Sequence, residues 1–315
     1  MEATDKIKDE DSPQATIRVE DLWFPDHNLV LQAGNRLFRV SGGLLAARSP
    51  VFRDMLSIPQ PDSQPLIDGC PLVILHDSPL DAEYFLKAIF DSAFFERPPA
   101  LTTFHIVAGV LRLATKYDVE YLQHRALLHL SAALPRSLEE YDLRTPAGPF
   151  ASRHSEFSLL MLATDLGLTW ALPMAMYLAS CFPVKAIIDG IPFAGSDTQL
   201  SLPLQRTLLI WRSTLAIAQN NDIIRCLRVL PSDGCLSREA CLSKSRQAHD
   251  AFTGIKGVNP LGVMNAAVWS TLAPLLCAPC YLAAEDEHRR ARQKIWGDLP
   301  AVFGLELEAW GAPQT

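Results

Sequence analysis

Four cysteines in the C-terminal half are spaced in the sequence as the ligands of a metal site often are. Cys277 and Cys280 form a C-x-x-C pair, and Cys235 and Cys241 form a C-x5-C pair upstream. A C-x-x-C places two thiolates close enough to share one tetrahedral ion, and a second pair brought near by folding completes a closed four-thiolate site. The pattern predicts a structural zinc ion, which would contribute folding free energy and no catalysis.

The ligand set has alternatives. The C-x5-C spacing departs from the commoner C-x2-4-C, and Cys226, His249 or His288 could replace one of the four cysteines. The plainest alternative is that the cysteines are separate small residues in a helical domain. Disulfides are disfavoured because the seven cysteines are odd in number and the polar, acidic N-terminus lacks the apolar core of an export signal. We therefore expect an intracellular protein, either cytoplasmic or nuclear.

Motifs that carry catalysis are missing from the sequence. It contains no G-x-S-x-G nucleophile elbow, no glycine-rich phosphate loop and no H-E-x-x-H pair. In His76-Asp77 and His249-Asp250 the two residues are adjacent, so their side chains point in different directions on a helix or a strand. We expect no catalytic residues and no small-molecule cofactor. The alternative is a hydrolase or transferase in the helical half, which would need a cleft with convergent polar groups and perturbed ionisation.

Charge and hydropathy disfavour two further classes of partner. The 315 residues carry a formal net charge of −7 without a cluster of Lys and Arg, which argues against nucleic acid. Apolar runs are interrupted by Pro, Gly or charge well before about 18 residues, so we expect no membrane span. Other proteins are the expected partners.

The elements that would position these residues begin with a hairpin. Leu29, Leu31 and Ala33 alternate with Val30 and Gln32. Gly34-Asn35 fits a two-residue turn, and the alternation returns at Phe38 and Val40. This pattern predicts two antiparallel strands.

Helices and a further strand follow the hairpin. From Gly43 the apolar spacing becomes helical on both sides of Ser49-Pro50, which predicts two short helices. The turn-rich segment from Ile58 to Pro71 predicts a loop, and LVILHD, from Leu72 to Asp77, predicts a strand. The next helix has Ser78 as its N-cap.

Two more helices complete this region. Thr102 or Thr103 is expected to cap the first, Asp118 is expected to cap the second, and Pro135 is expected to end it. Apolar stripes on the helices of the region predict a buried core made of Phe52, Leu86, Ile89, Val110, Leu113 and Leu122.

The order of these elements, with the segments LAARSPVFRDM and ATKYDVEYL, resembles the BTB/POZ domain in the form expanded in mushroom-forming fungi. The resemblance implies an α+β fold class, with a short β-sheet flanked by a cluster of α-helices followed by a mostly α-helical C-terminal region. It implies a BTB/POZ domain at 17–134. The lack of apolar periodicity predicts a disordered tail at 1–16 and a linker at 135–150, and helical apolar spacing predicts a helical region at 151–315, with a possible cysteine-rich metal site.

The end of the chain is similar to the region that accompanies BTB domains in many mushroom proteins. The elements that carry this likeness are Cys277, Cys280, Arg292, Trp296, Leu299-Pro300 and Phe303-Gly304-Leu305.

The resemblance implies a non-enzymatic interaction module that self-associates or docks a partner, as an adapter, a transcriptional co-regulator or a substrate adapter for cullin-type ubiquitin ligases. Two departures count against the last two roles. Ser41-Gly42 stands where BTB transcription factors commonly have His and a basic residue, and no Glu follows Met55 where cullin adapters often have one.

Leu22, Trp23 and Phe24 form a bulky apolar cluster ahead of the hairpin. In the BTB family the segment before the first strand often exchanges between two subunits, so this cluster is a candidate interface for a homo-oligomer. The alternative is that these side chains cover the core of their own chain.

Overall fold

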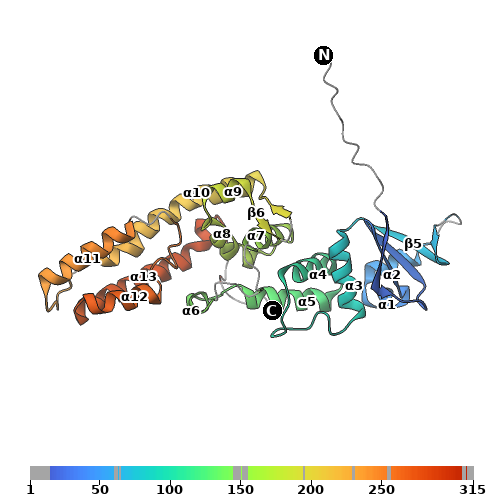
Figure 1. Cartoon of the computed structure of the whole chain (residues 1–315), viewed down its shortest axis with the longest axis horizontal. Helices are drawn as coiled ribbons and strands as arrows, with labels where there is room; N and C mark the ends of the chain where they lie inside the picture. The colour runs from blue at the N-terminus through green and yellow to red at the C-terminus, as the bar shows by residue number, and fades with distance from the viewer. Residues whose placement is uncertain are drawn as a thin grey trace, which may run out of the picture. The chain divides into compact units, whose positions relative to one another are not determined.

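In the computed structural model, the predicted hairpin lies at the centre of a five-stranded sheet (Figure 1). β2 (Leu29–Ala33) and β3 (Arg36–Val40) pair antiparallel, with Ala33 opposite Arg36. Gly34 adopts a φ of +53° in the two-residue turn between them, a backbone conformation that favours glycine. The hairpin and its turn are therefore confirmed.

The structure describes residues 15–59, 63, 65–144, 150, 155–193, 196–228, 231–253, 257–306 and 310. Most of the predicted tail, 1–16, and part of the predicted linker, 135–150, lie outside these residues. The chain divides into two compact units, and the boundary between them in the sequence lies between Leu130 and Ser131. The first holds the sheet and a cluster of helices and the second is mainly helical, so the α+β class is confirmed.

The strand order in the sheet is β1-β3-β2-β5-β4. β1 (Ile17–Trp23) lies parallel to β3 at one edge, and β5 (Cys70–Leu75) lies parallel to β2. β4 (Leu66–Ile67) pairs antiparallel with β5 at the other edge, inside the segment predicted as a loop. The loop prediction was wrong here because Asp68-Gly69, with φ values of 50° and 76°, forms a tight hairpin turn.

The N-terminal unit also contains four helices and most of a fifth, which crosses the boundary between the units. They are α1 (Gly42–Arg48), α2 (Pro50–Ser57), α3 (Pro79–Phe90), α4 (Phe104–Lys116) and α5 (Glu120–Ala133). Ser49 separates α1 from α2, as predicted, and its hydroxyl accepts a hydrogen bond from the amide of Phe52. The same hydroxyl donates to the carbonyl of Tyr117, which fastens the α1–α2 break to the end of α4.

α3 and α4 pack closely at Gly109. A Cβ atom at this position would lie 2.8 Å from Asp81 Oδ1 and 3.1 Å from Asp81 Cα. Only a residue without a side chain lets the two helices approach this far. Ser78 caps α3 as predicted, because its hydroxyl accepts from the amide of Asp81 at 3.5 Å.

Two helix caps differ from expectation. Thr103 is the N-cap of α4, but its side chain makes no capping hydrogen bond. Asp118 does not cap α5. It has a φ of 53° in the turn between α4 and α5, a left-handed conformation that aspartate tolerates and that differs from the extended backbone of an N-cap.

The core prediction is confirmed at five of its six residues, with exposed fractions of 4% or less at Phe52, Leu86, Val110, Leu113 and Leu122. Ile89 is only partly buried. The helical phase of α3 turns Phe85 and Leu86 toward the core, together with Ala82 and Ala88, which leaves Ile89 at the margin.

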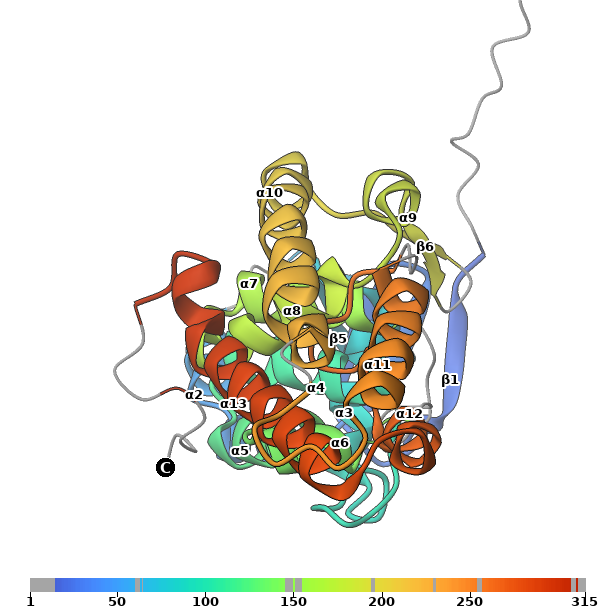
Figure 2. The ribbon, with the colours of Figure 1, turned by 90° about the vertical axis from the view of Figure 1, so that its left-hand side faces the viewer.

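The second unit contains α6 (Leu138–Asp142), α7 (Glu156–Asp165), η1 (Thr169–Ala171), α8 (Leu172–Ser180), α9 (Val184–Asp189), α10 (Leu202–Ala218), η2 (Gln219–Ile223), η3 (Ile224–Leu227), α11 (Arg238–Thr253), α12 (Ala266–Leu272), η4 (Ala273–Leu275) and α13 (Ala278–Val302). β6 (Ile191–Phe193) and β7 (Ser196–Thr198) add a small antiparallel hairpin. Figure 2 turns this unit toward the viewer, and α10 and α13 both pack against α8. Among the described residues, no helix has the length and hydropathy needed to cross a bilayer.

Candidate metal centre

The four predicted cysteines lie on the segments that begin α11 and α13. Cys235 lies in the turn before α11, and Cys241 lies in the first turn of that helix. Cys277 is the N-cap of α13, Pro279 occupies its start, and Cys280 follows in the first turn. The cap conformation at Cys277 and the helical turn after it place both sulfurs of the C-x-x-C at one end of the helix.

The sulfurs meet at metal-binding distance. The Sγ atoms of Cys235, Cys241, Cys277 and Cys280 all lie within 4.8 Å of one another. Cys277 Sγ lies 3.9 Å from Cys235 Sγ. Zn–S bonds of about 2.3 Å in a tetrahedron separate the sulfurs by about 3.8 Å, so this pair has the spacing that zinc requires. The prediction that folding brings the two pairs together is confirmed.

Backbone amides donate to three of the sulfurs. The N–H of Leu236 donates to Cys277 Sγ at 3.5 Å, that of Ser232 to Cys280 Sγ at 3.4 Å, and that of Cys277 to Cys241 Sγ at 3.4 Å. Such donors stabilise the thiolate form, which is the form that binds metal. The amides of Leu236 and Cys280 lower the pKa of the Cys277 thiol to about 6. The pKa of Cys235, by contrast, is raised to about 12 by desolvation and the neighbouring thiols, and that of Cys241 is also raised, so in the absence of an ion Cys277 is the thiol that ionises first.

The alternative ligands lie outside this cluster of described residues. Cys226 is fully buried with its sulfur 3.8 Å from Met264 Sδ, and burial raises its thiol pKa to about 12. His249 Nδ1 lies 3.2 Å from Asp250 Oδ1, so the side chains of this adjacent pair do meet, contrary to the expectation that they point apart. His288 packs its ring against Trp269, 5.1 Å between centroids. The geometry therefore favours the four-cysteine set over the substituted ones.

The residues predicted as an interface lie against their own unit. Leu22 is 1% exposed, so its own chain covers it. Trp23 is half-buried and packs on a cluster formed by Val30, Leu37 and Cys70. The ring of Phe24 lies 5.9 Å from that of Phe90 in α3. Part of the surface of Trp23 and Phe24 remains open to solvent.

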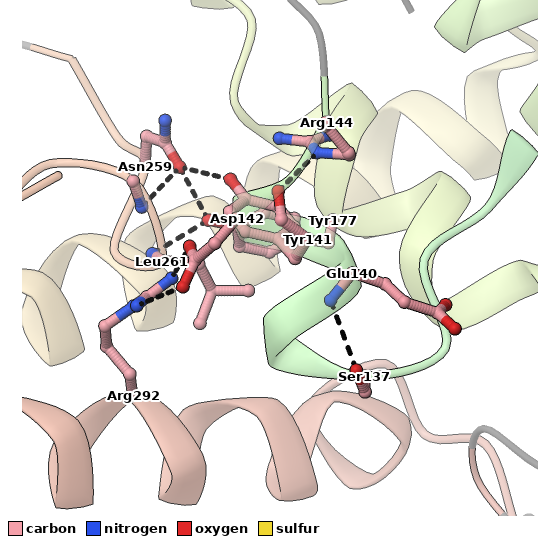
Figure 3. Close-up of polar contacts among 10 residues, drawn as sticks. Ser137, Glu140, Tyr141, Asp142, Arg144, Tyr177, Asn259, Leu261 and Arg292 are labelled. Atoms are coloured by element: carbon pink, nitrogen blue, oxygen red, sulfur yellow. Dashed lines mark hydrogen bonds and ion pairs between the residues drawn. The ribbon is translucent and has the colours of Figure 1, made fainter. Parts of the chain in front are cut away.

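A second polar cluster, which the sequence did not predict, lies inside the helical unit (Figure 3). The hydroxyls of Tyr141 and Tyr177 both donate to Asn259 Oδ1, at 3.1 and 2.7 Å. The amide of Leu261 donates to the Tyr177 hydroxyl at 2.9 Å. Arg292 of α13 pairs with Asp142 of α6 beside these tyrosines.

This cluster is organised to hold segments together. Burial raises the pKa of both tyrosines, so both phenols are neutral near pH 7. Their hydroxyls are hydrogen-bonded to Asn259, which lies 118 residues from Tyr141 and 82 from Tyr177. These hydrogen bonds join α6, which lies in the segment predicted as a linker, to α8 and to the loop before α12. All the hydrogen-bond partners of this cluster come from the same chain, so its role is to hold the segments of the helical unit together.

No protein-family model matches the chain, and no curated protein matches it. What the protein does is therefore inferred from its fold, its cysteine cluster and its sequence motifs.

Proposed function

We propose that this chain is a non-enzymatic interaction protein whose N-terminal unit is a BTB/POZ-type domain. The observation that carries the proposal is the order of elements, in which the β2–β3 hairpin is followed by the α1–α2 pair, β5, α3 and the α4–α5 pair. This order accompanies the LAARSPVFRDM and ATKYDVEYL segments that resemble the family. The unit would self-associate or dock a partner protein, and the helical unit would present a second surface.

Self-association is tested by light scattering of the full chain across a concentration series. A homo-oligomer formed through the N-terminal strand should gain mass with concentration. Ile17 lies on β1 with 55% of its surface exposed, so Ile17→Lys should weaken such an oligomer. Ile217→Lys, at a 60% exposed position of the helical unit, is the matched control. A strictly monomeric mass at high micromolar concentration contradicts self-association and leaves the docking of a partner protein as the role of this unit.

We also propose that Cys235, Cys241, Cys277 and Cys280 hold a structural zinc ion. Support comes from the mutual distances of the sulfurs and from the amides that donate to them. Four thiolates leave no open coordination position, so the ion would clamp the start of α11 to the start of α13 without catalysis.

Metal analysis of protein never exposed to a chelator tests the zinc proposal. About one zinc per chain is expected, and less than about 0.2 contradicts it. Cys277→Ser combined with Cys280→Ser should abolish zinc binding. Cys70→Ala is the control, because it removes a cysteine of the N-terminal unit and should leave the metal content unchanged.

A further inference from the structure

A small hollow opens on the N-terminal unit between the end of β1 and the end of α3. Its volume is about 270 Å³. Phe24, Phe90 and Phe94 are among the residues that line it, and all three are only half-buried. Large aromatic side chains left partly exposed side by side are uncommon on a surface without a ligand or a partner.

The charged groups of the hollow are two carboxylates and one ammonium, from Asp21, Asp91 and Lys87. The ammonium is already matched, because Lys87 Nζ lies 2.9 Å from Asp21 Oδ2 and 3.1 Å from Glu83 Oε1. The hollow therefore has a surplus of negative charge beside its aromatic walls.

Asp91 is the acid that is free to take another cation. It is exposed, and its carboxylate accepts a hydrogen bond from the amide of Ala93 at 2.9 Å, with no ion pair among the described residues. It is also the C-cap of the 12-residue helix α3, where the backbone carbonyls carry partial negative charge. A cation placed beside Asp91 would benefit from both.

We propose that this hollow receives an arginine side chain of a partner polypeptide, with the guanidinium against the phenyl faces and its N–H groups directed at Asp91. Guanidinium groups stack on aromatic rings and bind carboxylates through several donors, which matches both features of the wall. Lys87 Nζ, 5.9 Å from the ring centroid of Phe94, shows that a cation is compatible with this environment.

Other occupants fit less well. An anion would meet the surplus negative charge. A purely apolar side chain would displace water from the carboxylate of Asp91 without replacing its hydrogen bonds. The inference rests on the proposed role as an interaction protein and names the chemistry of one partner contact.

The test uses the full chain and two matched peptides, acetyl-Gly-Gly-Arg-Gly-Gly-amide and the same peptide with citrulline, which keeps the shape and removes the charge. Binding is followed by nuclear magnetic resonance titration. The arginine peptide should bind weakly, in the range of about 1 mM, and more weakly as salt is raised. The citrulline peptide should not bind.

Variants locate the binding. Asp91→Asn removes the negative charge but keeps an oxygen that accepts from the amide of Ala93. Phe94→Leu removes the aromatic ring but keeps an apolar side chain. Each variant should weaken binding of the arginine peptide by about threefold or more. Asp54→Asn, an exposed acid on α2, is the control and should change nothing. Equal binding of both peptides, or unchanged binding by Asp91→Asn, overturns the inference. Failure of this inference would leave the proposed function standing if light scattering shows an oligomer.

Discussion

The backbone amide of Cys277 donates to the sulfur of Cys241 at 3.4 Å, although 36 residues separate the two in the sequence. This contact joins the N-cap of α13 to the first turn of α11, so the beginnings of the two helices are fixed against each other before any ion is considered. The four sulfurs are thus partly preorganised by hydrogen bonds. Binding of zinc would add to this arrangement, and its loss would weaken the same contact.

Removal of zinc should therefore lower the thermal stability of the helical unit. Chelation of the full chain should lower its melting temperature or split the unfolding transition in two, because binding to the folded state alone stabilises it. The measurement is calorimetry with and without a strong chelator, and re-addition of zinc should restore the original trace. Cys241→Ser protein should melt alike in both conditions. Identical traces for the unsubstituted chain would contradict a structural role for zinc.

Truncation of Leu113 should destabilise the N-terminal unit. Leu113 is 4% exposed on α4, and Leu113→Ala should lower the free energy of unfolding by about 2 to 5 kcal/mol through lost burial and a residual cavity. Ile89→Ala is the comparison, since Ile89 is only partly buried and should cost less. Denaturant unfolding of both variants measures the difference. A cost below about 1 kcal/mol at Leu113 would mean that the site collapses without a cavity.

The Tyr177–Asn259 contact predicts a second stability effect. Tyr177→Phe removes the donor to Asn259 Oδ1 and the acceptor for the amide of Leu261, so it should cost about 1 to 3 kcal/mol. Tyr141→Phe removes a single, longer bond to the same oxygen and should cost less. Both are read from denaturant unfolding of the full chain. Equal costs would show that the two hydroxyls contribute alike.

Local features of this fold could be predicted from the sequence. The Gly34-Asn35 turn, the Ser49 break and the Ser78 cap each depend on a few neighbouring residues, whose conformational preferences are strong. Asp118 shows the limit of such prediction. An aspartate before a helix is a good N-cap by propensity, but the turn between α4 and α5 holds Asp118 in a left-handed conformation that an N-cap does not have.

Features that depend on distant residues could be predicted only in part. The cysteine spacing defined two candidate pairs, and the fold alone determined that they meet. The Tyr141–Tyr177–Asn259 cluster had no signal in the sequence, because its members follow no periodic pattern and lie in segments separated by loops. The position of α6 was likewise not predicted. Tyr141 packs its ring against Tyr177 of α8, and Asp142 pairs with Arg292 of α13.

The last prediction concerns pH and His288. This side chain is 4% exposed on α13, and burial, followed by the nearby charge of Arg292, lowers its pKa from 6.5 to about 4. The unfolded chain therefore binds a proton at His288 between about pH 6.5 and pH 4 while the folded chain does not. The contribution of His288 to the free energy of unfolding is therefore complete above pH 6.5 and is lost as the pH falls toward 4. The loss is at most about 3 kcal/mol.

His288→Phe isolates this contribution, because it keeps an aromatic ring against Trp269 and removes the titrating group. The free energy of unfolding of both proteins is measured by denaturant at several pH values between 4 and 7.5. The other titrating groups, among them Asp142 beside Arg292, act in both proteins and cancel in the difference. The unsubstituted chain should lose more stability than the variant as pH falls. Parallel pH profiles would show that His288 titrates alike in the folded and unfolded states.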